Sequence, residues 1–103
     1  MSSRDRAYVA DMKHLIDQGN LLALQEYYQN LMEGDHDVLP AWDYIYQNVY
    51  LHACLKHKTE IVDWMKTLFP LLPTITQIAM RQVFAYGNYL QKRNNPYLER
   101  VKN

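Results

Sequence analysis

The fold is decided by one stretch, His52-Ala53-Cys54-Leu55-Lys56-His57-Lys58-Thr59-Glu60-Ile61-Val62-Asp63-Trp64-Met65, in which one helix is predicted to end and a second to begin. Apolar residues lead into it at the spacing of one helical face, namely Trp42, Ile45, Val49 and Ala53. Thr59 is predicted to cap the second helix, because its hydroxyl can accept a hydrogen bond from a free backbone N–H. Glu60 and Asp63 follow in or near the first turn, where the helix dipole favours negative charge. The stretch therefore predicts a helix-turn-helix.

Four residues of this stretch resemble the ankyrin repeat, whose consensus runs A-x-x-x-G-x-x-E-I-V across its two helices. Ala53, Glu60, Ile61 and Val62 match it in spacing and type over ten residues, and His57 stands where the glycine belongs. The T-P-L-H start of the repeat is absent. Glu-Ile-Val-x-Trp is also similar to divergent ankyrin repeats of large DNA viruses. The resemblance implies an all-α module for protein–protein interaction that needs no cofactor.

Three predicted turns are almost evenly spaced, since Gly19, His57 and Asn94 lie 38 and 37 residues apart. This near-period predicts an all-α fold of about six helices in three antiparallel helical hairpins, ankyrin-like or a short α-solenoid. The hairpins would cover roughly residues 3–34, 38–70 and 74–102 of a single helical domain, 1–103. A non-repetitive bundle of six helices is the alternative.

Helix boundaries follow from caps and breakers. Ser2 or Ser3 is predicted to cap the first helix. Asp37 is predicted to cap the third helix, with Pro40 in its first turn. Met32 is expected on the inward face of the second helix. The predicted helices cover residues 4–17, 20–33, 39–57, 60–69, from 74 onward, and 97–101.

The fifth predicted helix has the clearest pattern. Thr74 to Gln77 has capping-box form, in which Thr74 bonds the amide of the third helical residue and Gln77 reaches back. Gly87 lies inside this helix and would weaken it by about 1 kcal/mol relative to alanine. A close helix contact or a kink is therefore predicted at Gly87. The inward stripe is predicted to be Ile75, Ile78, Ala79, Val83, Tyr86 and Leu90.

Composition favours a globular domain in a reducing compartment. The 103 residues are 49% apolar and 21% charged, and the single cysteine, Cys54, excludes an internal disulfide. No signal peptide is recognised at the start, and no apolar run reaches the roughly 18 residues of a membrane span. A cytoplasmic location is predicted, or a virion if the protein is viral, and no membrane partner.

Charge is zero overall but unevenly divided. Residues 1–50 carry a net charge of −5 and residues 51–103 a net charge of +5. This division favours partner binding or association of copies, and mutual neutralisation within one chain is the alternative. The basic second half also contains Tyr86, Tyr89 and Tyr97, a combination that suits nucleic acid. Nucleic-acid binding is the least favoured function, because the pI near 6.9 is far below the basic norm.

Residues with metal-binding or catalytic chemistry occur only as isolated pairs. His14 and Asp17 are three positions apart, as are Cys54 and His57, and neither pair has the further ligands of a structural zinc site. The loop of residues 35–37 is too short for a calcium loop of about twelve residues. Cys54 lies in mid-helix and is predicted to be a packed, inert thiol. No metal, no cofactor and no enzymatic activity are predicted.

Aromatic residues are more numerous than one core face per helix can hold, with nine tyrosines and two tryptophans. Tyrosine and tryptophan are favoured at protein interfaces, where the ring is buried and the polar tip is bonded. The predicted function is therefore an adapter-like module that binds another protein, and the alternative is a small structural or self-assembling subunit, such as a virion component. The predicted contact surface consists of Asp35, His36, Asp37, Trp42, Tyr44, Tyr46 and Tyr50, with Trp64 as a secondary candidate.

Overall fold

The computed structural model describes residues 2–36 and 39–93. Within these ranges the chain is helical and contains no strand, which confirms the all-α class. The predicted sixth helix and the turn at Asn94 lie outside the described residues. The elements are α1 (Ser3–Asp17), α2 (Leu21–Glu33), α3 (Trp42–Leu55), α4 (Thr59–Leu68), the 3-10 turn η1 (Phe69–Leu71) and α5 (Thr74–Arg93).

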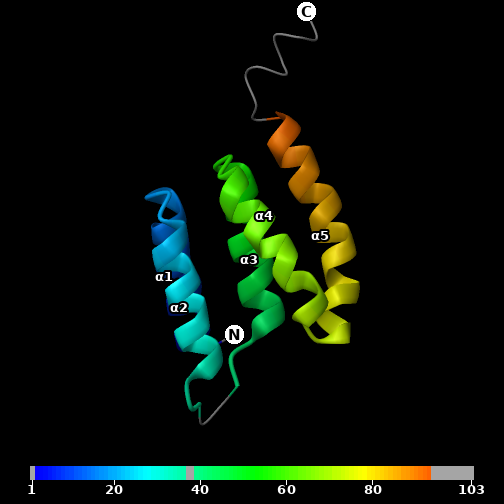
Figure 1. The fold of residues 1–103 in the computed structure, drawn as a ribbon. Helices are drawn as coiled ribbons and strands as arrows, with labels where there is room; N and C mark the ends of the chain where they lie inside the picture. The colour runs from blue at the N-terminus through cyan, green and yellow to red at the C-terminus, as the bar shows by residue number, and fades with distance from the viewer. Residues whose placement is uncertain (1, 37–38, 94–103) are drawn as a thin grey trace, which may run out of the picture.

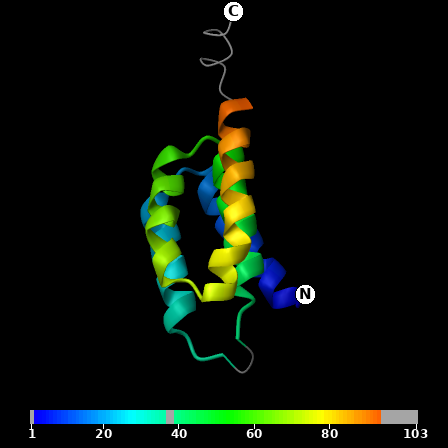
Figure 2. The same cartoon turned by 90° about the vertical axis from the view of Figure 1, so that its right-hand side faces the viewer.

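The five α-helices lie in two layers (Figures 1 and 2). One layer contains α1, α3 and α5 side by side, with α3 in the middle and in contact with both neighbours. The other layer contains α2, which contacts α1, and α4, which contacts α3. Among the described residues, the second layer contains no third helix that would pack on α5. The contacts of α5 are therefore mainly with α3.

Two tight turns, α1–α2 and α3–α4, have the same backbone geometry. The helix before each turn ends with a residue in the left-handed region, Gly19 at φ 66° and His57 at φ 57°. Gly19 N donates to Ile16 O over 2.8 Å, and His57 N donates to Cys54 O over 3.2 Å. The next amide of each turn donates to the carbonyl five residues back, over 3.1 Å from Asn20 and 3.0 Å from Lys58. Both turns are therefore Schellman motifs.

Helix caps agree with the sequence at one end of the chain and differ elsewhere. Ser2 caps α1 as predicted, because its Oγ accepts from Asp5 N over 3.1 Å. Thr59 is the first residue of α4 rather than its cap, and Lys58 at the cap position makes no side-chain bond. The predicted cap was wrong because the Schellman turn places Lys58 directly before the helix.

The starts of α3 and α5 also differ from the predictions. α3 begins at Trp42, three residues later than predicted, and Ala41 is its cap residue. Ala41 N donates to Asp5 Oδ1 of α1 over 3.2 Å, so a distant carboxylate takes the role predicted for Asp37. Asp37 itself lies outside the described residues. The predicted capping box of α5 was wrong, since Gln77 Nε2 donates to Leu72 O over 2.9 Å instead of reaching Thr74.

The core lies between the layers and is built mainly on α3. Six residues of α3 are buried, among them the aromatic pair Tyr46 and Tyr50, which are 2% and 0% exposed. Their rings stack with centroids 6.1 Å apart, and the Tyr46 hydroxyl donates to Met65 O of α4. Burial of both rings raises the pKa of their hydroxyls. α3 is thus the central helix of the molecule.

The predicted inward stripe of α5 was partly wrong. Val83 and Leu90 pack against the core as predicted, but Ala79 is exposed. Ile75, Ile78 and Tyr86 are 77%, 58% and 52% exposed, whereas Thr76 and Met80 are buried at 3% and 0%. The prediction of a close helix contact at Gly87 is confirmed. A Cβ built there would lie 2.8 Å from Tyr50 Cε1 and 3.0 Å from Cys54 Sγ. The backbone of α5 can approach α3 only with glycine at this position, and that contact selects the buried face.

Candidate partner-binding surface

The predicted contact residues of α3 divide between core and surface. Tyr46 and Tyr50 belong to the core, so they present no surface to a partner. Their burial explains part of the tyrosine excess, because α3 has α1, α4 and α5 as neighbours and needs large side chains on more than one face. Trp42 and Tyr44 are half-buried against the core and keep an exposed edge. Trp64 of α4 is half-buried in the same way.

Of the predicted contact loop, residues 35–37, only part is exposed for contact with a partner. Asp35 is exposed, and Asp37 lies outside the described residues. His36 is half-buried, and its Nε2 donates to Leu31 O at the end of α2 over 2.8 Å. The ring of Tyr8 meets His36 edge to face, with centroids 6.4 Å apart. His36 therefore closes the end of α2, and Asp35 is the loop residue whose side chain is free of these contacts.

One residue that was not among the predicted contacts joins the two tryptophans. The Tyr28 ring of α2 meets Trp42 edge to face, with centroids 5.8 Å apart. The same ring also meets Trp64 edge to face, with centroids 5.6 Å apart at 89°. Trp42, Tyr28 and Trp64 thus form one aromatic cluster across α3, α2 and α4. Apolar periodicity does not predict this cluster, because the three rings come from three separate helices.

A groove of about 420 Å³ lies between α2 and α4, next to this cluster. Met32 was predicted to point inward, but it is 51% exposed and lines the groove. The other lining residues are Gln25, Tyr28, Gln29, Glu33, Trp64 and Leu68. The groove combines an apolar floor with amide and carboxylate groups on the α2 side. α2 contains Glu26 and Glu33 and no basic residue, so its charge is negative.

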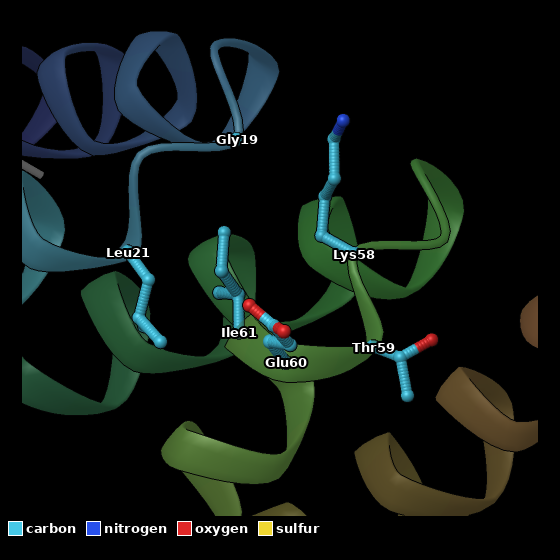
Figure 3. A pocket seen from close by; sticks show the side chains of 6 residues that line it. All are labelled: Gly19, Leu21, Lys58, Thr59, Glu60 and Ile61. Atoms are coloured by element: carbon cyan, nitrogen blue, oxygen red, sulfur yellow. The ribbon is translucent and has the colours of Figure 1, made fainter.

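A smaller hollow of about 250 Å³ lies between the two Schellman turns (Figure 3). Gly19 and Leu21 lie on one side of it, and Lys58, Thr59, Glu60 and Ile61 on the other. Ile61 is buried and Leu21 is half-buried, so these two side chains pack the first turn against the second. We therefore attribute this hollow to the packing of the two turns against each other and do not treat it as a binding site.

Two polar contacts attach α1 to α3, at opposite ends of the helices. Asp5 accepts from the Ser2 hydroxyl and from Ala41 N, and these bonds hold its pKa below the ordinary value. His52 Nε2 lies 2.7 Å from Asp17 Oδ1. This bond lowers the pKa of Asp17. Both carboxylates serve the packing of α1 on α3.

The candidate nucleophile and the candidate metal ligands from the sequence do not form a reactive or metal-binding site in the described residues. Cys54 is fully buried, and burial raises the pKa of its thiol, so it acts as a packing residue. In the described part of the chain no three His, Cys, Asp or Glu side chains gather where they could hold a metal ion. None of the helices in residues 2–36 and 39–93 combines the length and the apolar character that a membrane span requires.

Comparison with known proteins adds no relative: no protein-family model, no curated protein and no solved structure matches the chain.

Proposed function

We propose that this chain is a non-enzymatic protein–protein interaction module, and that it binds its partner in the groove between α2 and α4. The observation that carries the proposal is the exposed thioether of Met32 beside the half-buried rings of Tyr28 and Trp64. Methionine adapts its shape to different apolar surfaces, and aromatic rings contribute most of the energy at many interfaces. The groove offers both at one place.

The charge around the groove indicates the kind of partner. α2 carries two carboxylates and no basic residue. A segment with an apolar anchor and flanking lysine or arginine residues would complement this rim. An amphipathic helix with a basic flank fits such a groove in shape and in charge.

The test uses a displayed library of random peptides, selected against the whole chain. Selected peptides should carry an apolar and basic pattern, and Met32→Glu should weaken their binding at least about tenfold. Leu39→Glu is the matched control, because it makes the same charge change at an apolar residue that is 80% exposed outside the groove. Trp42→Phe leaves Trp64 as the only tryptophan, so its fluorescence reports occupancy of the groove. Equal binding by the Met32 and Leu39 variants would refute the groove as the site.

A small self-assembling or structural subunit is the second candidate, and the exposed apolar face of α5 favours it. The ankyrin-like resemblance and the arrangement as repeated hairpins also remain predictions. They are supported by the two Schellman turns, whose left-handed residues, Gly19 and His57, are 38 positions apart. A cytoplasmic or virion location is likewise a prediction.

A further inference from the structure

The residues that follow α5 in the sequence have the apolar pattern that would suit the groove between α2 and α4. Residues 94–103 read Asn-Asn-Pro-Tyr-Leu-Glu-Arg-Val-Lys-Asn and lie outside the described residues. Tyr97 and Leu98 precede Val101 by four and three positions, a spacing that places the three apolar side chains on one face of a helix. The 94–103 segment therefore has the apolar anchor of an amphipathic helix.

The charge of this part of the chain is positive. Between positions 92 and 103 the sequence has one acid, Glu99, and four basic residues, which are Lys92, Arg93, Arg100 and Lys102. Basic residues thus occur on both sides of the apolar anchor. Apolar and basic residues in this order are the combination that complements an acidic groove.

The rim of the groove carries the opposite charge. Glu33 lines it and is exposed, and Glu33 Oε1 accepts from Gln29 Nε2 over 3.1 Å. Among the described side chains, no lysine or arginine forms an ion pair with Glu33. Lys66 of α4 lines a different hollow, of about 360 Å³, beside Phe69 and Phe84. The Glu33 carboxylate is therefore available to a basic side chain of a bound segment.

A helical 94–103 segment is too short to enter the groove of its own chain. α5 has 20 residues and starts directly after η1, so the segment begins about 30 Å from that turn. Figure 1 shows the last turn of α5 (orange) at one end of the molecule and the last turn of α2 (cyan), which contains Met32, at the other. Ten helical residues span only about 15 Å. The groove that such a segment can fill belongs to another copy.

We propose that the 94–103 segment of one copy binds in the groove between α2 and α4 of a second copy. This inference rests on the proposed function of the groove and identifies its partner as the same chain. The contact is heterologous, because segment and groove are different surfaces, so each added copy brings a further free groove. The net charges of −5 for residues 1–50 and +5 for residues 51–103 agree with this head-to-tail order.

Two full-length variants test the arrangement by complementation. Met32→Glu alters the groove and keeps the segment, whereas Leu98→Glu alters the segment and keeps the groove. Each variant alone should associate at least about tenfold more weakly than the wild type. Their equimolar mixture should form a heterodimer and stop there, while the wild type grows beyond a dimer with concentration in light scattering. Leu39→Glu is the matched control and should associate like the wild type, since Leu39 is 80% exposed outside the groove. A mixture that stays monomeric, or a wild type that stays monomeric at its highest soluble concentration, would overturn the inference.

A synthetic peptide of residues 94–103 tests the contact without self-association. It contains no tryptophan, so Trp64 fluorescence of the Trp42→Phe chain, kept dilute, reports its binding. Binding should saturate, weaken as salt screens the opposite charges, and weaken at least about tenfold with Leu98→Glu in the peptide. Library peptides that bind through Met32 while the 94–103 peptide does not would overturn this inference and leave the groove as a site for another protein. Library peptides that bind the Met32→Glu and Leu39→Glu chains equally would overturn both proposals.

Discussion

α5 presents two faces of similar apolar content to very different surroundings. The inner face places Met80 and Gly87 against α3, and both residues are buried. The outer face carries two isoleucines and two tyrosines, all more than half exposed. The inner face also carries Val83, Phe84 and Leu90, which pack against the core. The inner face is buried because it fits the neighbouring helix more closely.

The decisive feature is steric. Tyr50 and Cys54 fill the surface of α3 where α5 crosses it, and only a residue without a Cβ leaves room for them. Glycine lets two helix backbones approach closely, and the surrounding side chains then pack at high density. Thr76 and Met80 complete this face, and Phe84 meets Tyr50 edge to face with centroids 5.0 Å apart. The apolar residues that remain outside are available for other contacts.

Substitutions on the inner and outer faces of α5 should differ in their effect on the free energy of unfolding. Met80→Ala should lower the free energy of unfolding by about 2–5 kcal/mol, because it leaves a cavity in a fully buried site. Ile78→Ala, on the outer face of the same helix, should change it by no more than about 0.5 kcal/mol. Urea unfolding followed by circular dichroism at low protein concentration measures both. Similar losses for the two variants would contradict the assignment of the faces.

A smaller effect tests the steric argument. Gly87→Ala improves helix propensity by about 1 kcal/mol, yet the new methyl group must displace Tyr50 or Cys54. Overpacking of this kind costs about 1–3 kcal/mol, so the variant should be less stable than the wild type. Adding Cys54→Ala should recover part of the loss, because it removes the sulfur 3.0 Å from the new Cβ. A more stable Gly87→Ala variant in the same urea titration would show that the contact is loose.

Much of the fold could be predicted from local patterns. Apolar periodicity identified five helices within the described ranges, and Gly19, Gly87 and Ser2 were assigned correctly from their chemistry as a turn, a close contact and a cap. These features depend on residues close in sequence or on the absence of a side chain. Gly19 and His57 were also predicted as turn positions, and a turn is present at each.

Features that depend on distant residues could not be predicted. The side-chain acceptor for the cap residue of α3 is Asp5 of α1, and the aromatic cluster joins Tyr28 to Trp42 and Trp64 from three helices. The choice between two apolar stripes on α5 depends on the shape of α3. The surface roles predicted for Tyr46 and Tyr50 ignored that a central helix is buried on more than one side. Periodicity describes one helix at a time, and each of these features needs at least two.

The second Schellman turn has a residue with a side chain at the position where the backbone conformation favours glycine. His57 occupies the left-handed region at φ 57°, the conformation that Gly19 adopts in the first turn. A residue with a Cβ is strained there by about 1–3 kcal/mol, and His57 Nε2 is also buried without a hydrogen-bond partner in the described residues. Glycine would remove both costs but lose the packing of the ring, so His57→Gly should stabilise the chain by about 1 kcal/mol.

Gly19→Ala is the matched control. A Cβ there meets only the mobile end of Lys58, 3.7 Å away, so its expected loss of about 1 kcal/mol reflects backbone strain alone. A higher urea midpoint for His57→Gly and a lower one for Gly19→Ala would show that backbone strain determines the effect on stability at both turns. A loss of stability in both variants would mean that the His57 ring contributes more by packing than its backbone costs, and that the second turn is held by its side chain.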